Sequence, residues 1–295
     1  METIGFIGAG NLGTPIVTNL LKAGYKVKVY NRTREKALPL EALGAELVSS
    51  PAAAAVPGGI VISLVADDKA VESVAGDELL QALGHGGIHV SMSTISPDTS
   101  RVLAAHHQKQ GVTYVAAPVF ARPEAAAAKV GNSVISGPAA AKERIRPLLE
   151  AGFAKNIFDL GEDVGSANVL KLMGNFMIAG AIEMMAEAFA LGEKNGVDPK
   201  VAYEMLTTTL FATPIFRGYG SMVIDRTYVG NPAFSAPLGL KDMNLVLQTA
   251  TRSHTPMPLA QLVQSRLMTV VARDVKDADW TALAMGALED AGLKS

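Results

Sequence analysis

The sequence predicts an α/β fold in which a doubly wound parallel sheet is followed by an all-helical domain. Up to about residue 163, short runs rich in Val and Ile alternate with single helical patterns of about ten to fifteen residues, which is typical of parallel strands joined by right-handed crossover helices. After Gly165 the strand-like runs stop and only helical patterns follow. We therefore expect two domains, residues 1–163 and residues 164–295, and the length of the chain suits two cores.

Each element of the first domain is predicted by its hydrophobic period. Continuous or alternating apolar runs indicate strands, and apolar positions three or four residues apart indicate helices. The expected strands are residues 3–8, 26–32, 46–50, 59–65, 87–94, 113–120, 133–137 and 155–161. The expected helices include residues 14–24, 34–44, 67–83 and 138–152. We expect all of these elements to form one doubly wound domain.

The second domain is expected to begin with one long helix, residues 166–194, that ends at Asn195-Gly196. Between residues 173 and 191 it is apolar on nearly every side, so it should run through a core. Met173, Met177, Met184 and Met185 are expected to fill that core, and Glu183 and Glu187 to form a polar stripe at a helix or subunit interface. Such a helix needs more cover than the remaining residues can give, which predicts a homodimer.

Composition and charge exclude several classes of function. The 26 basic and 28 acidic residues leave a net charge of −2 without long runs of like charge, so nucleic acids and membranes are not expected partners. The chain has no cysteine, and its five histidines lack metal-ligand spacing, so no metal site is expected; these histidines are expected in loops or on helix surfaces. The chain starts in a strand-like run without a leader pattern, and we expect a cytoplasmic protein.

A glycine pattern at the first strand-to-helix junction predicts a dinucleotide site. Gly8, Gly10 and Gly13 have the spacing G-x-G-x-x-G, in which the glycines allow a tight turn, close approach to a pyrophosphate, and close helix packing. The expected cofactor-binding residues here are Gly8, Ala9, Gly10, Asn11 and Leu12. A glycine-rich structural turn is the alternative, but the strand-turn-helix context favours a Rossmann-type site.

The end of the second strand predicts which dinucleotide binds. Enzymes that use NAD usually carry an acidic residue there, which binds the ribose hydroxyls, but this chain has Asn31, Arg32 and Thr33. A guanidinium binds a 2′-phosphate by charge-assisted hydrogen bonds. We therefore expect NADPH as the cofactor, the alternative being a solvated polar turn.

Several motifs in this order resemble those of the β-hydroxyacid dehydrogenases, a family that includes 3-hydroxyisobutyrate dehydrogenase and the glyoxylate and succinic semialdehyde reductases. Besides the glycine pattern, they are residues 31–33 (NRT), 90–97 (VSMSTISP), 168–175 (NVLKLMGN) and 240–244 (LKDMN). The resemblance covers nearly the whole chain and is specific for the family rather than for a substrate. It implies a Rossmann domain that binds NADP and a helical domain for substrate binding and dimerisation, with the site in the cleft between them.

The resemblance also implies roles for single residues. Lys171 matches the family's catalytic acid or base, and Asn175 matches the asparagine one helical turn later. Leu64, Val65, Thr94 and Lys241 match cofactor contacts, while Thr94, Phe234 and Asp242 match positions on the substrate side. A surface ion pair is the alternative for Lys241 and Asp242.

The chemistry of reduction fits Lys171 and Asn175. Residues four apart share one helix face, so the ammonium and the carboxamide can converge on one substrate oxygen. Hydride arriving at a carbonyl carbon leaves an alkoxide, to which a positioned lysine can donate a proton. Without the resemblance, a lysine in an apolar helix is more often a snorkelling or ion-paired side chain.

One motif departs from the family. Where the family usually has Pro-Val-Ser-Gly-Gly, whose serine and glycines bind the substrate carboxylate, this chain has Phe120 and Arg122 in residues 118–123 (PVFARP). A phenyl ring cannot donate a hydrogen bond, so the pocket should be drier. Arg122 either replaces the lost donors with a bidentate fork or is exposed to solvent and inert.

The sequence therefore predicts an NADPH-dependent reductase of small aldehydes or keto acids that also runs in reverse as a 3-hydroxyacid dehydrogenase. Imine reduction is the first alternative, because imine reductases share the architecture and Phe120 suits an uncharged substrate. Those enzymes usually carry aspartate or tyrosine at the position of Lys171, which favours carbonyl chemistry. The second alternative is a non-catalytic NADPH-binding module, which would need no proton donor.

Overall fold

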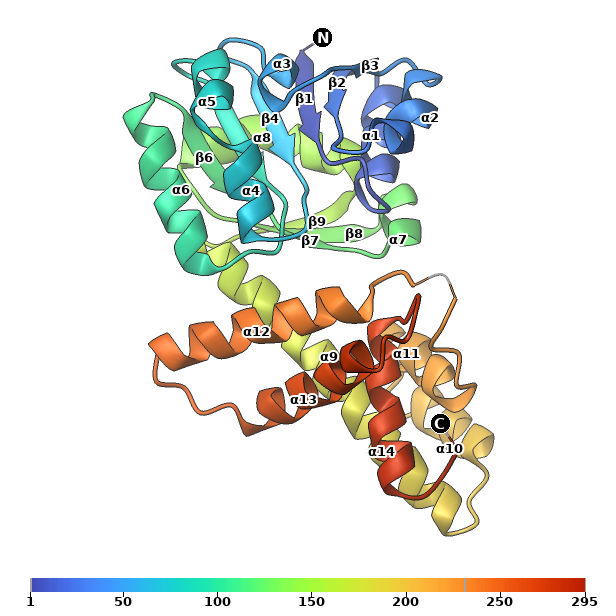
Figure 1. The fold of residues 1–295 in the computed structure, drawn as a ribbon. Helices are drawn as coiled ribbons and strands as arrows, with labels where there is room; N and C mark the ends of the chain where they lie inside the picture. Colours follow the sequence, from blue (N-terminus) through green and yellow to red (C-terminus); the bar gives the residue numbers. More distant parts are fainter. Residues whose placement is uncertain (1, 231, 295) are drawn as a thin grey trace. The chain divides into compact units, whose positions relative to one another are not determined.

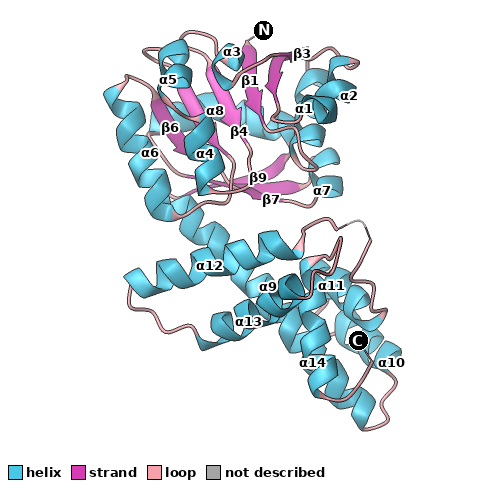
Figure 2. Cartoon of the chain, in the orientation of Figure 1, coloured by secondary structure: helices cyan, strands magenta, loops and turns pink. Residues whose placement is uncertain are grey.

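The computed structural model describes residues 2–230 and 232–294, which fall into two compact units, Met1–Lys171 and Leu172–Ser295. Figure 2 shows that the strands belong to the first unit, whereas the second is built of helices. The boundary lies within one long helix, whose first two turns belong to the first unit.

The first unit contains a six-stranded parallel sheet in the order β3-β2-β1-β4-β5-β6 (Figure 1). The strands are β1 (Thr3–Ile7), β2 (Lys26–Tyr30), β3 (Glu46–Leu47), β4 (Ile60–Ser63), β5 (Ile88–Ser91) and β6 (Thr113–Ala116). Because β1 pairs with β2 on one side and with β4 on the other, the strand order reverses beside β1. This confirms the doubly wound Rossmann-type sheet, in which ligands bind at the carboxyl ends of the strands next to the reversal.

Helices cover both faces of this sheet. Ile60 and Ile62 pack in a cluster with residues of α1 (Gly13–Lys22) and α8 (Ala139–Gly152), whereas Val61 between them packs with residues of α4 (Asp68–Val74) and α5 (Asp77–Leu83). This alternation explains why β4 reads as a continuous apolar run. The helices of the unit are α1 (Gly13–Lys22), α2 (Leu38–Glu41), α3 (Pro51–Ala54), α4 (Asp68–Val74), α5 (Asp77–Leu83), α6 (Pro97–Lys109), α7 (Pro123–Ala127) and α8 (Ala139–Gly152), with a 3-10 turn η1 (Arg34–Ala37).

After β6 the chain leaves the parallel sheet and forms a second, three-stranded sheet. It consists of β7 (Val119–Phe120), β8 (Gly131–Ile135) and β9 (Ala154–Asp159), and β7 runs antiparallel to β8. The backbone N–H of Ala117 still donates to Ser91 of β5, but Pro118 has no N–H with which to continue the ladder. The expected strand 113–120 is therefore divided between two sheets.

The second unit is helical. It contains α9 (Gly165–Lys194) from Leu172 onward, α10 (Pro199–Thr208), α11 (Pro214–Ile224), α12 (Ala236–Arg252), α13 (Pro258–Ala272), a 3-10 turn η2 (Trp280–Leu283) and α14 (Ala284–Asp290). Gly196, with φ of +77°, follows the end of α9, as the sequence predicts. By length and composition alone α9 is apolar enough to cross a membrane; in the structure Ala179, Ile182 and Phe189 pack in the core of the unit, as in the central helix of a soluble protein.

Two expectations about buried and exposed side chains are wrong, and the first concerns the methionines of α9. Met173, Met177 and Met184 are 52%, 67% and 48% exposed, and of the four methionines only Met185 is buried. Glu183, in contrast, is buried and forms an ion pair with Arg266 of α13, 2.9 Å from Oε1 to Nε, which is a polar contact at a helix interface, as expected.

The second wrong expectation concerns two of the histidines. His89 in β5 and His107 in α6 are fully buried, although all five were expected in loops or on helix surfaces. Their rings stack, with 2.8 Å between Nδ1 of His89 and Nε2 of His107.

Candidate functional site

The glycine loop is shaped by two glycines and left open by the third. Gly8 has φ of +104°, and a Cβ on it would lie 2.1 Å from the Leu64 carbonyl oxygen; a Cβ on Gly13 would lie 2.0 Å from the Gly8 carbonyl oxygen. A Cβ on Gly10, in contrast, would meet no atom within 4 Å. Gly8 and Gly13 are therefore required by packing, whereas Gly10 leaves space at the start of α1, where backbone N–H groups bind phosphate. These residues fit a dinucleotide.

Asn31 links this loop to the end of β2. Its Oδ1 accepts a hydrogen bond from the Ala9 N–H at 2.9 Å, and its Nδ2 donates to the Thr33 carbonyl oxygen at 2.7 Å. Arg32 and Thr33 are exposed, and Arg32 forms no hydrogen bond or ion pair with any residue that the structure describes. Asn31 thus positions the loop, while Arg32 presents a guanidinium to solvent at the edge of the nucleotide site.

Leu64, Val65 and Thr94 follow the carboxyl ends of β4 and β5, beside the point where the strand order reverses. The Val65 N–H donates to Oγ of Ser93 at 2.8 Å, which connects the two strand ends. Ser93 was not singled out in the sequence. Its place beside Thr94, just after a predicted strand, was the signal that could have identified it.

The first two turns of α9 are anchored in the first unit. Ser136 of the loop after β8 accepts a hydrogen bond from the Ala167 N–H and donates to the Val164 carbonyl oxygen, at 3.2 and 2.8 Å. Ser100 of α6 donates to Oδ1 of Asn168 at 2.8 Å. The bond from the Ala167 N–H satisfies a backbone donor of the first turn that has no partner within the helix, and together these bonds hold the start of α9, one turn before Lys171.

Lys171 and Phe120 meet within the first unit. The Nζ atom of Lys171 lies 4.2 Å from the centroid of the Phe120 ring, and Lys171 is 9% exposed. Phe120 ends β7, and the half-buried Arg122 precedes α7. Asn19 of α1 holds α7 in place by donating to the carbonyl oxygen of Ala126 at 2.9 Å.

Within the second unit, Asp242 joins two other predicted site residues. Its Oδ2 accepts a hydrogen bond from Nδ2 of Asn175 at 2.5 Å, and its Oδ1 lies 2.7 Å from Nζ of Lys241. Asp242 is fully buried, with 0% exposure. Its two oxygens therefore hold Asn175 on α9 and Lys241 on α12 in fixed positions.

Phe234 packs against the core of the helical unit. Its ring makes an edge contact with Trp280, 4.8 Å between centroids, and its backbone N–H donates to Oδ2 of Asp279 at 3.2 Å. Phe234 is partly buried. These two contacts fix its orientation, and neither of them is with another predicted site residue.

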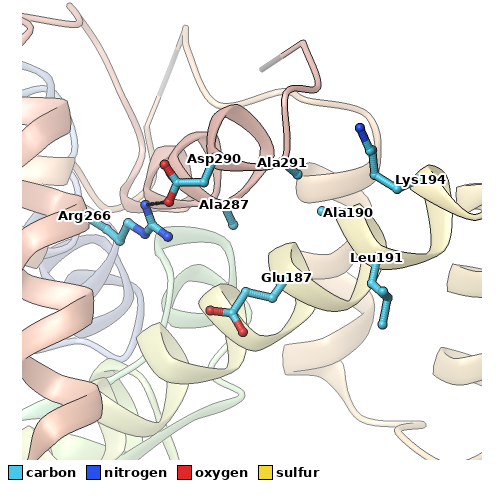
Figure 3. A pocket seen from close by; sticks show the side chains of 8 residues that line it. All are labelled: Glu187, Ala190, Leu191, Lys194, Arg266, Ala287, Asp290 and Ala291. Atoms are coloured by element: carbon cyan, nitrogen blue, oxygen red, sulfur yellow. Dashed lines mark hydrogen bonds and ion pairs between the residues drawn. The ribbon is translucent and has the colours of Figure 1, made fainter.

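The helical unit also has an open pocket of about 440 Å³ between α9, α13 and α14 (Figure 3). Its lining residues are Glu187, Ala190, Leu191, Lys194, Arg266, Ala287, Asp290 and Ala291. In Figure 3 the guanidinium of Arg266 points to Asp290, to which it donates a hydrogen bond at 2.6 Å. None of these eight is a predicted site residue, so this pocket is separate from the residues described above.

Comparison with known families matches both parts of the chain. Residues 3–161 match the NAD binding domain of 6-phosphogluconate dehydrogenase, and residues 165–286 match the NAD-binding domain of NADP-dependent 3-hydroxyisobutyrate dehydrogenase. The two matches meet close to the start of α9.

Individual proteins match over almost their full length. The chain is 41% identical to the uncharacterised oxidoreductase YfjR of Bacillus subtilis, over 95% of this chain and 98% of the relative. It is 31% identical to an NAD-dependent L-serine dehydrogenase of Pseudomonas aeruginosa, over 96% and 97%. Among solved structures, the Mycobacterium tuberculosis 3-hydroxyisobutyrate dehydrogenase with L-serine superposes with a TM-score of 0.86 at 26% identity, covering 97% of this chain and 99% of the other.

Proposed function

The chain belongs to the β-hydroxyacid dehydrogenase family, and from this premise we propose that it is an NADPH-dependent reductase of small aldehydes or keto acids. In the reverse direction it would oxidise the corresponding hydroxy compounds. Family membership makes the chain an oxidoreductase that uses a nicotinamide cofactor and acts on small molecules with CH–OH groups. The choice of NADPH, the proton donor and the substrate are the proposed part.

The observation that carries the proposal is the placement of Lys171. A lysine that is 9% exposed, held over an aromatic ring at 4.2 Å, is fixed in one place, as a proton donor must be. When bound, the nicotinamide supplies or accepts a hydride at the substrate carbon. Lys171 binds the substrate oxygen through its ammonium, stabilises negative charge on it and donates the proton.

Asn175 lies one helical turn after Lys171 on the same face of α9. Because one of its N–H groups is held by Asp242, the plane of its carboxamide is fixed and it orients the substrate or the Lys171 side chain. Asp242 also balances the charge of Lys241, which leaves Lys241 in a fixed position for a cofactor contact.

Arg32 supports the choice of NADPH over NADH. Its exposed guanidinium follows the strand end at which NAD-dependent enzymes usually carry an acid, and a guanidinium binds a phosphate by charge-assisted hydrogen bonds. The relative from Pseudomonas aeruginosa is NAD-dependent, so the comparison of both cofactors is part of the test.

We propose a homodimer in the cytoplasm. Met173, Met177, Met184 and Leu191 are exposed and lie within about 40° of one another on α9 at 100° per residue. An exposed apolar stripe of this length marks an interaction surface. A second copy of the chain would cover it.

Imine reduction is the second candidate, and Phe120 is the observation that favours it. The ring beside Lys171 carries no hydrogen-bond donor for a carboxylate, which suits an uncharged substrate. Lys171 favours carbonyl compounds, because its proton stabilises the oxygen that becomes an alkoxide.

The test is a screen of NADPH and NADH oxidation with glyoxylate, succinic semialdehyde, simple aldehydes and cyclic imines. Faster turnover of carbonyl compounds with NADPH is the expected result. Turnover of imines alone would replace the proposal by the second candidate. Tight NADPH binding without turnover of any compound would leave a binding module and contradict the proposal.

A further inference from the structure

Phe120 is placed by the second sheet and not by the parallel one. In the antiparallel pair β7–β8, Val119 lies opposite Ser133 and Phe120 opposite Asn132. Successive side chains of a strand point to opposite faces, so Val119 packs in the cluster with α1 and α8, whereas the half-buried Phe120 packs on the other side. The alternation fixes the direction of the ring.

Lys171 contacts this ring from the second turn of α9, and hydrogen bonds hold the start of this helix in place. The hydroxyl groups of Ser136 and Ser100 hold the first turn of α9. Arg101 binds Asp163, just before the helix, through two hydrogen bonds of 2.9 and 2.7 Å. Both partners of the contact therefore lie on fixed backbone, and the 4.2 Å between Nζ and the ring centroid is well within the range of a cation–π interaction.

The ring has two consequences for chemistry at Lys171. Its negative face attracts the ammonium and opposes its movement toward solvent. Its edge offers no donor, so a substrate carboxylate placed beside it would lose hydrogen bonds to water without replacement, which is costly in a partly buried site. A neutral alkyl or aryl group in the same place would instead bury apolar surface.

We propose that Phe120 positions the Lys171 ammonium through a cation–π contact and restricts the enzyme to carbonyl compounds that carry no carboxylate at that place. The proposal rests on the proposed reductase function and narrows its substrates, from small aldehydes and keto acids in general to aldehydes or ketones that place an apolar substituent beside Phe120. Arg122 lies two residues after Phe120. It could reverse the preference for substrates without a carboxylate, by binding a carboxylate as the serine of the family's motif does.

The experiment compares a matched pair of substrates, butanal and succinic semialdehyde, which differ by the terminal carboxylate. The wild-type enzyme should have a kcat/KM for butanal about tenfold or more above that for succinic semialdehyde, the usual scale for an unpaired polar group in a site. Phe120→Ser should reverse or abolish this ratio. Phe158→Ser, at an exposed position of β9 in the same sheet, is the matched control and should leave the ratio unchanged.

A second set of variants distinguishes the effect of the Phe120 ring on the Lys171 ammonium from its effect on substrate choice. Phe120→Leu removes the ring but stays apolar, so it should keep the preference for butanal. Its kcat should fall and the alkaline limb of the pH–rate profile should move to lower pH, because the ammonium loses its contact with the ring face. Phe120→Tyr keeps a ring face and should restore kcat and the position of the limb. NADPH binding by each variant shows that the first unit is folded.

The outcomes distinguish this inference from the proposed function. If the wild type reduces no carbonyl compound, the proposed function fails and this inference with it. If it reduces carbonyl compounds but prefers succinic semialdehyde, and Arg122→Met removes that preference, the carboxylate is bound by Arg122 and the restriction by Phe120 is wrong. If Phe120→Leu leaves kcat and the pH–rate profile unchanged, the positioning role is wrong while the reductase function stands.

Discussion

The buried histidine pair of the first unit makes the stability of the fold depend on pH in a defined direction. Nδ1 of His107 donates to the Leu103 carbonyl oxygen at 2.6 Å, so its Nε2 must accept from Nδ1 of His89 at 2.8 Å when both rings are neutral. Nε2 of His89 then accepts from the Ser63 hydroxyl at 2.9 Å. The two nitrogens that face each other, Nδ1 of His89 and Nε2 of His107, can be bonded only while at least one ring is neutral, and burial disfavours a charge on either ring.

The magnitude follows from the pKa of His107. Burial lowers this pKa from 6.5 to about 4, and burial together with His107 lowers the pKa of His89 well below 6.5. In the unfolded chain both rings bind a proton below 6.5, so stability that is fully present above this pH is lost as the pH falls from 6.5 toward 4. For His107 the loss is about 3 kcal/mol at about 1.4 kcal/mol for each unit of pKa, and His89 adds to it.

Urea unfolding between about pH 7 and about pH 4.5 measures this loss. His107→Asn keeps a donor near the Leu103 carbonyl oxygen but cannot titrate, so it should be less stable than the wild type at neutral pH and lose less unfolding free energy on acidification. His85→Gln, which replaces an exposed histidine, is the control and should follow the wild type. The reasoning is refuted if His107→Asn loses unfolding free energy as steeply as the wild type over this range.

Three further changes test other parts of the structure. Arg32→Ala should weaken NADPH binding about tenfold or more and leave NADH binding nearly unchanged, as measured by titration calorimetry; equal effects on both cofactors would contradict the 2′-phosphate assignment. Asp242→Ala removes the acceptor of the buried Asn175 amide and should lower the free energy of unfolding by about 1 to 3 kcal/mol, seen in chemical denaturation; an unchanged free energy of unfolding would contradict this role of Asp242. Met177→Glu combined with Met184→Glu should convert a dimer to a monomer by light scattering, since it places charge on the apolar stripe; a monomeric wild type, or a dimer that survives the double change, would exclude this face.

Local patterns predicted the parts of the fold that depend on neighbours in sequence. The parallel Rossmann sheet and the glycine loop follow from hydrophobic period and from the spacing of Gly8, Gly10 and Gly13. The second sheet was not predicted, because a single proline, Pro118, decides that the strand changes sheets, and the antiparallel pairing of β7 with β8 depends on residues far apart in the chain.

The sequence named candidate site residues, but it did not predict which residues their side chains contact. Asn31 was expected to bind the cofactor, yet its side chain is engaged with Ala9 and Thr33, and this depends on how the loop folds back. The contact of Phe120 with Lys171 joins residues of two distant segments. The sequence therefore showed that Phe120 stands where the family has a serine, but it did not show that the ring contacts Lys171. Buried His89 and exposed Met177 were misjudged for the same reason, because burial is set by tertiary packing.

The central claim, that Lys171 is the proton donor of a carbonyl reductase, is tested most directly by Lys171→Met. This change keeps most of the side-chain volume and deletes the ammonium. We expect NADPH to bind with near wild-type affinity while kcat for the best carbonyl substrate falls by about a hundredfold or more, the scale of a lost general acid. Lys194→Met, at an exposed position near the end of the same helix, should keep full activity, and near-normal turnover by Lys171→Met would contradict the account.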